Sequence, residues 1–138
     1  MFFNNDKNND EVNDLVKIAA LLIHAASIDE NYTKQEENII KQTLVEIGAN
    51  KENLEKILND AKVMEKNASQ ILDFTKKVKN MNHKSKIMII ESLWKIIYSN
   101  NDADIYETNL MRRLAGLLYI DNKIMGDIKE KIKNAKSS

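Results

Sequence analysis

The chain has 138 residues and a mass of 15.9 kDa, which is the size of a single domain. Its 21 basic and 21 acidic residues balance at pH 7, so no excess of positive charge favours binding to nucleic acid. The absence of cysteine excludes disulfides, thiolate metal sites and thiol redox chemistry.

The start of the chain and its apolar runs predict a cytoplasmic protein. Residues 1–10 lack the cationic and apolar stretches of a signal peptide. The longest apolar runs, at 18–26 and 87–97, are short and are interrupted by polar residues. We therefore predict no membrane span and expect a cytoplasmic location.

The composition favours helices, because the chain has no proline and only three glycines. We predict an all-α fold, a compact bundle of about seven helices. The first helix, from about residue 12 to 26, and the fifth, at 83–99, are apolar over so much of their surface that both are expected to be central. The others carry their apolar residues at 39–47, 54–64, 71–78, 110–118 and 124–132.

Short-range signals mark the expected helix ends. Gly48 is placed to end the second helix in a left-handed conformation, Asn50 can cap the third, and Asp121 or Asn122 can cap the seventh. We predict a flexible N-terminus at 1–10, a single helical domain at 11–133 and a flexible tail at 134–138.

The chain contains an internal repeat with an offset of 71 residues. The polar segment 29–36 aligns with 100–107, and flanking apolar residues obey the same shift: Leu22 falls on Leu93, and Ile40 falls on Met111. Two related helical hairpins, at about 12–48 and 83–119, are expected to bury their apolar helices against each other in a pseudo-two-fold arrangement.

Two passages resemble the TerB family, which is named for tellurite resistance and is related to the N-terminal domain of the DjlA co-chaperone. They are residues 21–29 with Glu36, and residues 93–100 with Glu107 and 110–115. The resemblance implies a compact all-α fold of about seven helices and an acidic surface linked to metal ions. It implies no established catalytic activity, and we predict that the chain is not an enzyme.

Both polar loops present oxygen ligands followed by a carboxylate from the next helix, a pattern that suits a hard cation. The candidate metal ligands are Asp29, Asn31 and Glu36 in the first loop, and Asn100, Asp102 and Glu107 in the second. Neither loop matches an EF-hand, so we expect weak binding of Ca²⁺ or Mg²⁺, with a dissociation constant on the order of 10⁻⁴ to 10⁻³ M. The first hypothesis is a non-enzymatic domain that binds a divalent cation in a metal or stress response.

The same residues have a purely structural interpretation. Thr33 with Glu36, and Asp104 with Glu107, have the spacing of capping boxes, in which side chains bond free backbone N–H groups. The alternative hypothesis is therefore a protein-interaction or co-chaperone-like adaptor whose acidic loops only cap helices. The sequence identifies neither a partner protein nor an oligomeric state.

The remaining polar residues of the helices have ordinary structural interpretations. His24 and His83 are predicted to be hydrogen-bonded structural histidines, because no second histidine or cysteine stands at ligand spacing. Glu91 is predicted to pair with Lys95 one turn further on.

Overall fold

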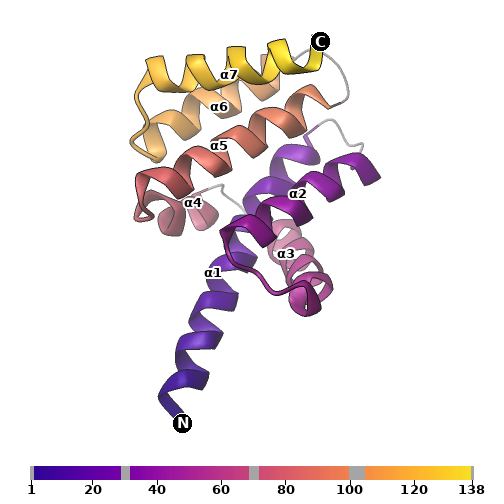
Figure 1. Ribbon diagram of the computed structural model, residues 1–138, viewed down its shortest axis with the longest axis vertical. Helices are drawn as coiled ribbons and strands as arrows, with labels where there is room; N and C mark the ends of the chain where they lie inside the picture. Colours follow the sequence, from indigo (N-terminus) through magenta and orange to yellow (C-terminus); the bar gives the residue numbers. More distant parts are fainter. Residues whose placement is uncertain (1, 29–31, 69–71, 100–104, 138) are drawn as a thin grey trace.

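The computed structural model describes residues 2–28, 32–68, 72–99 and 105–137, with side chains for 12–28, 32–68, 73–99 and 108–135 (Figure 1). These residues form seven α-helices and one short 3₁₀ turn, and the predicted all-α fold is confirmed. The elements are α1 (Phe2–Ala26), α2 (Lys34–Ile47), the 3₁₀ turn η1 (Lys51–Asn53), α3 (Leu54–Asn67), α4 (Leu72–Lys79), α5 (His83–Tyr98), α6 (Ile105–Leu117) and α7 (Asn122–Ser137).

The two helices predicted to be central do form the middle of the bundle. The C-terminal half of α1 packs against α2, α3, α4 and α5, while α5 also packs against α2 and α7. Leu22 of α1 and Leu93 of α5 have no exposed surface. Both helices are buried on most sides, because each carries apolar residues around most of its circumference.

Both ends of the chain are more helical than the apolar pattern indicates. The sequence predicts a flexible segment at 1–10, whereas α1 begins at Phe2 and its first turns project from the bundle in Figure 1. At the other end α7 continues to Ser137, through most of the predicted tail at 134–138. Apolar periodicity marks only the buried part of a helix, and no proline or glycine stops either one there. The flexibility of both segments stays a prediction.

The ends of α2 confirm two of the expected signals. The Thr33 hydroxyl accepts a bond from the Glu36 N–H at 3.1 Å, and the Glu36 carboxylate accepts one from the Thr33 N–H at 2.8 Å. This is the predicted capping box. Gly48 ends the helix with a φ of 130°, a value that L side chains rarely adopt.

The caps of α3 and α7 differ from each other. Asn50 precedes η1, but its side chain makes no capping hydrogen bond, so its predicted capping role is wrong. The inserted 3₁₀ turn is the reason: Asn50 contributes its backbone C=O, which accepts from the Asn53 N–H at 3.0 Å, and it lies too far ahead of α3 to cap it. Asp121 does cap α7, because its carboxylate accepts from the Lys123 N–H at 2.8 Å.

Backbone hydrogen bonds recur at the offset of 71 residues. The Ala49 N–H bonds the Leu44 carbonyl at 2.9 Å, and the Ile120 N–H bonds the Ala115 carbonyl at 3.0 Å. The residue before each donor has a positive φ, 130° at Gly48 and 56° at Tyr119. These matched helix ends support the predicted repeat.

The third helix of each half follows the same offset. Ile57 and Ala61 are buried in α3, and their counterparts Ile128 and Ile132 are buried in α7. We therefore call α1, α2, η1 and α3 the first unit, and α5, α6 and α7 the second unit. Within the described ranges, every helix is too short or too polar to cross a lipid bilayer.

Candidate functional site

The predicted metal ligands are only partly visible in the structure. Asp29, Asn31, Asn100 and Asp102 lie outside the described residues. Glu107 belongs to α6, but its side chain also lies outside them. Glu36, in the first turn of α2, is the one candidate ligand whose side chain the structure describes.

The residues that flank the two predicted loops are close to each other. A groove of about 400 Å³ lies between the end of α1 and α6, and its lining residues are His24, Ile28, Asn109, Leu110 and Arg113. Ile28 directly precedes the first loop, and α6 directly follows the second. We call this the α1–α6 groove.

A second groove lies where the start of α2 meets the end of α5. It has a volume of about 280 Å³ and lies between the start of α2, the end of α5 and the end of α7, with Gln35, Ile39, Tyr98 and Ser99 in its lining. Figure 1 shows the C-terminal end of α5 and the N-terminal end of α2 on the same side of the bundle. The helix ends that flank the two junctions therefore lie at one end of the molecule.

Glu36 is committed to the backbone of α2. Its residue is 2% exposed, and one carboxylate oxygen accepts the Thr33 N–H in the capping box. The structural interpretation is thus confirmed for Glu36. The corresponding cap by Asp104 and Glu107 falls outside the described residues and stays a prediction.

Tyr32 lies near several carboxylates in the described part of this end. Its hydroxyl is buried and has no hydrogen-bond partner in the structure. Burial raises the pKa of the Tyr32 hydroxyl well above its usual value, and the carboxylates of Glu37, Glu36 and Glu55 raise it further. The hydroxyl therefore stays neutral, among three glutamates from α2 and α3.

Lysines compensate part of this charge. The Lys62 ammonium lies 3.4 Å from the Glu37 carboxylate and 5.5 Å from the centre of the Tyr32 ring. The Lys41 ammonium lies 3.0 Å from the Glu55 carboxylate, and this hydrogen bond raises the pKa of Lys41. Such surface pairs contribute little to stability, so their main effect here is on local charge.

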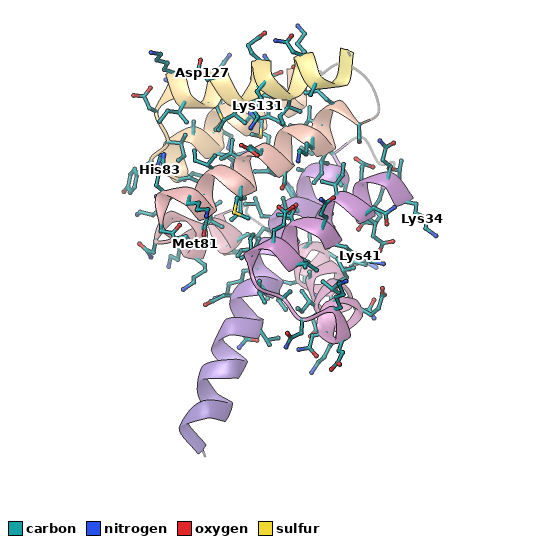
Figure 2. The ribbon with its side chains drawn as sticks, in the orientation of Figure 1. Lys34, Lys41, Met81, His83, Asp127 and Lys131 are labelled. Carbon is teal, nitrogen blue, oxygen red and sulfur yellow. The ribbon has the colours of Figure 1, made fainter. Side chains whose placement is uncertain are left out.

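His24 has the structural role predicted for it. Its Nδ1 lies 3.2 Å from a carboxylate oxygen of Glu65, which links α1 to α3 beside the α1–α6 groove. The prediction for Glu91 is wrong, because its carboxylate bonds the Lys131 ammonium at 3.2 Å instead of Lys95. The reason is tertiary: α7 packs along α5, and Figure 2 shows Lys131 on the side of α7 that faces α5.

The described carboxylates alone do not make a metal centre. Among residues whose side chains the structure describes, no three histidine, aspartate or glutamate side chains are grouped so that they could hold an ion. A cation site at this end therefore needs ligands from 29–31 and 100–104. The described carboxylates cannot enclose a cation, because Glu37 and Glu55 already pair with Lys62 and Lys41.

Sequence reasoning missed two features of this end. It did not single out Tyr32, whose aromatic ring within a polar loop was the available signal. It also missed the α1–α6 groove with Asn109 and Arg113, because nothing local in the sequence indicates that α6 lies beside the end of α1.

These observations define a class of protein: a small all-helical domain with two central helices and two hairpin junctions at one end. The family model described as tellurite resistance protein TerB matches residues 15–130 of the chain. The chain therefore belongs to the TerB family, as the sequence motifs indicated. Neither a curated protein nor a solved structure is similar enough to match it.

Proposed function

We propose that this TerB domain binds a divalent cation, Ca²⁺ or Mg²⁺, through its two acidic loops, and that it acts without catalysis in a metal or stress response. The observation that supports this most is the α1–α6 groove, which brings the residue before the first loop next to the helix after the second. We expect ligands from both loops to reach one ion.

The mechanism would be electrostatic. Carboxylates gathered at one end repel one another, and the carboxylates of Glu37, Glu36 and Glu55 already raise the pKa of Tyr32 there. A bound cation relieves that repulsion and connects the two loops, so it stabilises the domain by mass action. Such a change can alter how the domain contacts a partner.

A metal titration tests the proposal. Ca²⁺, Mg²⁺ or Mn²⁺ at about 100 times its dissociation constant should stabilise the fold by about 2.7 kcal/mol, measured by thermal unfolding and by Trp94 fluorescence. The double variant Asp29→Asn, Asp102→Asn should lose this response. Asp60→Asn, at an exposed position on α3, is the matched control and should keep it. A wild-type response in the double variant would contradict the proposal.

The adaptor hypothesis remains the second candidate, because Glu36 already serves as a buried helix cap. It predicts no cation-induced stabilisation in the wild-type chain. The variant Glu36→Gln separates the two roles of this residue. Glutamine can still accept the Thr33 N–H, so stability should change by less than about 1 kcal/mol, whereas a cation site would lose a charged ligand.

A further inference from the structure

A small cavity between α5, α6 and α7 lies outside the proposed cation site. Its volume is about 160 Å³, and its lining includes Trp94, Thr108, Arg112, Asn122, Gly126 and Lys129. We call it the α6–α7 cavity. Two of these residues are cationic and none is acidic.

The repeat shows why this cavity is positively charged. In the first unit, the counterpart of Arg112 is Lys41, which pairs with Glu55 at 3.0 Å. The counterpart of Glu55 at the offset of 71 is Gly126, so the second unit has no carboxylate at that position. The ion pair of the first unit is thus replaced by an arginine beside an open space.

Two further differences add to this positive charge. Thr108 stands where the first unit has Glu37, and Lys129 stands where it has Leu58. Among the described lining residues, one difference acts in the opposite direction, since Asn122 replaces Lys51. Among the described residues, neither Arg112 nor Lys129 has a carboxylate within ion-pairing distance.

Trp94 supplies an independent observation. Its residue is 2% exposed, and its indole Nε1–H is buried with no hydrogen-bond partner in the structure. A buried donor without an acceptor is uncommon in folded proteins. The Lys129 ammonium lies 5.4 Å from the centre of the same ring, so the indole and the cation lie at one wall of the cavity.

We infer that the α6–α7 cavity binds a tetrahedral oxyanion, namely phosphate or the phosphoryl group of a small phosphomonoester. Arg112 and Lys129 match the charge of a dianion, and the arginine fork can hold two of its oxygens. The side chains of Thr108 and Asn122 are further donors in the same lining. A volume of 160 Å³ holds roughly five waters at about 30 Å³ each, which suits an ion with four oxygens.

The chain offers a direct spectroscopic test. Trp94 is the only tryptophan, so its indole N–H gives a single resonance in a ¹H–¹⁵N spectrum of the full chain. At constant ionic strength, inorganic phosphate should move this resonance and saturate with a dissociation constant on the order of 1 mM, whereas chloride should not. No shift with phosphate beyond that with chloride would overturn the proposal.

Variants distinguish this site from general surface charge. Arg112→Gln should weaken phosphate binding by about tenfold or more, because it removes a charge-assisted donor pair. Arg113→Gln, next in the sequence but lining the α1–α6 groove instead, should bind like the wild type. Equal loss in both variants, or in neither, would contradict a site at the α6–α7 cavity.

Gly126 allows the first unit's ion pair to be rebuilt in the second. A Cβ atom added there meets nothing within 4 Å, so Gly126→Glu should fold and place a carboxylate near Arg112. Phosphate binding should then fall by more than tenfold relative to the uncharged Gly126→Gln. Equal loss in these two variants would refute the charge argument.

A second titration identifies the source of the phosphoryl group. Phosphoserine that binds at least as tightly as inorganic phosphate would identify phosphomonoesters as the ligands. Binding of inorganic phosphate alone would identify the free ion, and either result supports the cavity as an oxyanion site.

Discussion

The two units of this domain share a backbone plan but differ in how their second and third helices meet. In the first unit, the α2–α3 face carries the Lys41–Glu55 ion pair and the glutamates around Tyr32. In the second unit, the α6–α7 face has Arg112 and Lys129 around a cavity without a described acidic residue. The comparison teaches that a repeat can keep its fold while its surface charge changes, because exposed charge pairs contribute little to stability.

The largest expected effect tests whether the two central helices are equivalent. Leu22 and Leu93 are counterparts in the repeat and are both fully buried. Replacing either one by alanine removes the same buried volume, so Leu22→Ala and Leu93→Ala should each cost about 2 to 5 kcal/mol. Urea unfolding followed by circular dichroism measures both. A cost below about 1 kcal/mol for only one of them would show that the core belongs mainly to the other unit.

Tyr32 tests the negative environment of the first unit. Because its buried hydroxyl has no partner, Tyr32→Phe should stabilise the fold by about 1 kcal/mol or more at pH 7. The raised pKa adds a pH dependence. Above about pH 10 the unfolded chain ionises Tyr32 while the folded chain keeps it neutral, so stability falls as the pH rises.

The Tyr32→Phe variant should not show the loss of stability that Tyr32 causes above about pH 10. Chemical unfolding of the two proteins between pH 8 and about pH 11 measures the difference. The advantage of the variant should grow with pH, and a constant difference would contradict the burial argument.

A buried hydrogen bond tests how the units are joined. The Thr43 hydroxyl of α2 lies 2.6 Å from the Ser92 hydroxyl of α5, and each also lies within hydrogen-bonding distance of a carbonyl of its own helix, Ile39 or Met88. Because each hydroxyl has one hydrogen, one donates to the other hydroxyl while the second donates to its carbonyl. At the offset of 71 residues, Leu114 corresponds to Thr43 and Leu21 corresponds to Ser92, so the equivalent pair is apolar. Thr43→Val and Ser92→Ala should each cost about 1 kcal/mol.

A double-mutant cycle gives the energy of the bond itself. The combined variant should cost less than the two single costs added together, because the second substitution removes a bond that the first has already broken. Strict additivity would show that the hydroxyls act only through their own helices.

The smallest expected effects come from the two helix ends with positive φ. Gly48→Ala should lose about 1 kcal/mol, because alanine is strained at a φ of 130°. Tyr119 has the counterpart position with a φ of 56°, so Tyr119→Gly should relieve strain. Its net gain should stay below about 1 kcal/mol, since the contact with the Lys79 ammonium, 4.7 Å from the ring centre, is lost. In thermal unfolding, Gly48→Ala should therefore lower the melting temperature and Tyr119→Gly should raise it.

Local patterns predicted the parts of the fold that depend on neighbouring residues. The helical spacing of apolar residues identified the helices and the two central ones, and the Thr33–Glu36 spacing identified a capping box. The left-handed helix end at Gly48 was also predicted from the sequence. Each of these features is decided within a few residues of chain, where propensity and short-range hydrogen bonds dominate.

Only the tertiary structure decided which distant residues meet. Glu91 bonds Lys131 across two helices, and His24 bonds Glu65, although nothing near either residue in the sequence indicates these partners. The α1–α6 groove and the α6–α7 cavity arise in the same way, from the angle and register at which helices pack. Packing angle and register depend on how whole buried faces fit together. The sequence therefore predicted where each helix lies along the chain, whereas the residues that each helix contacts were decided by packing.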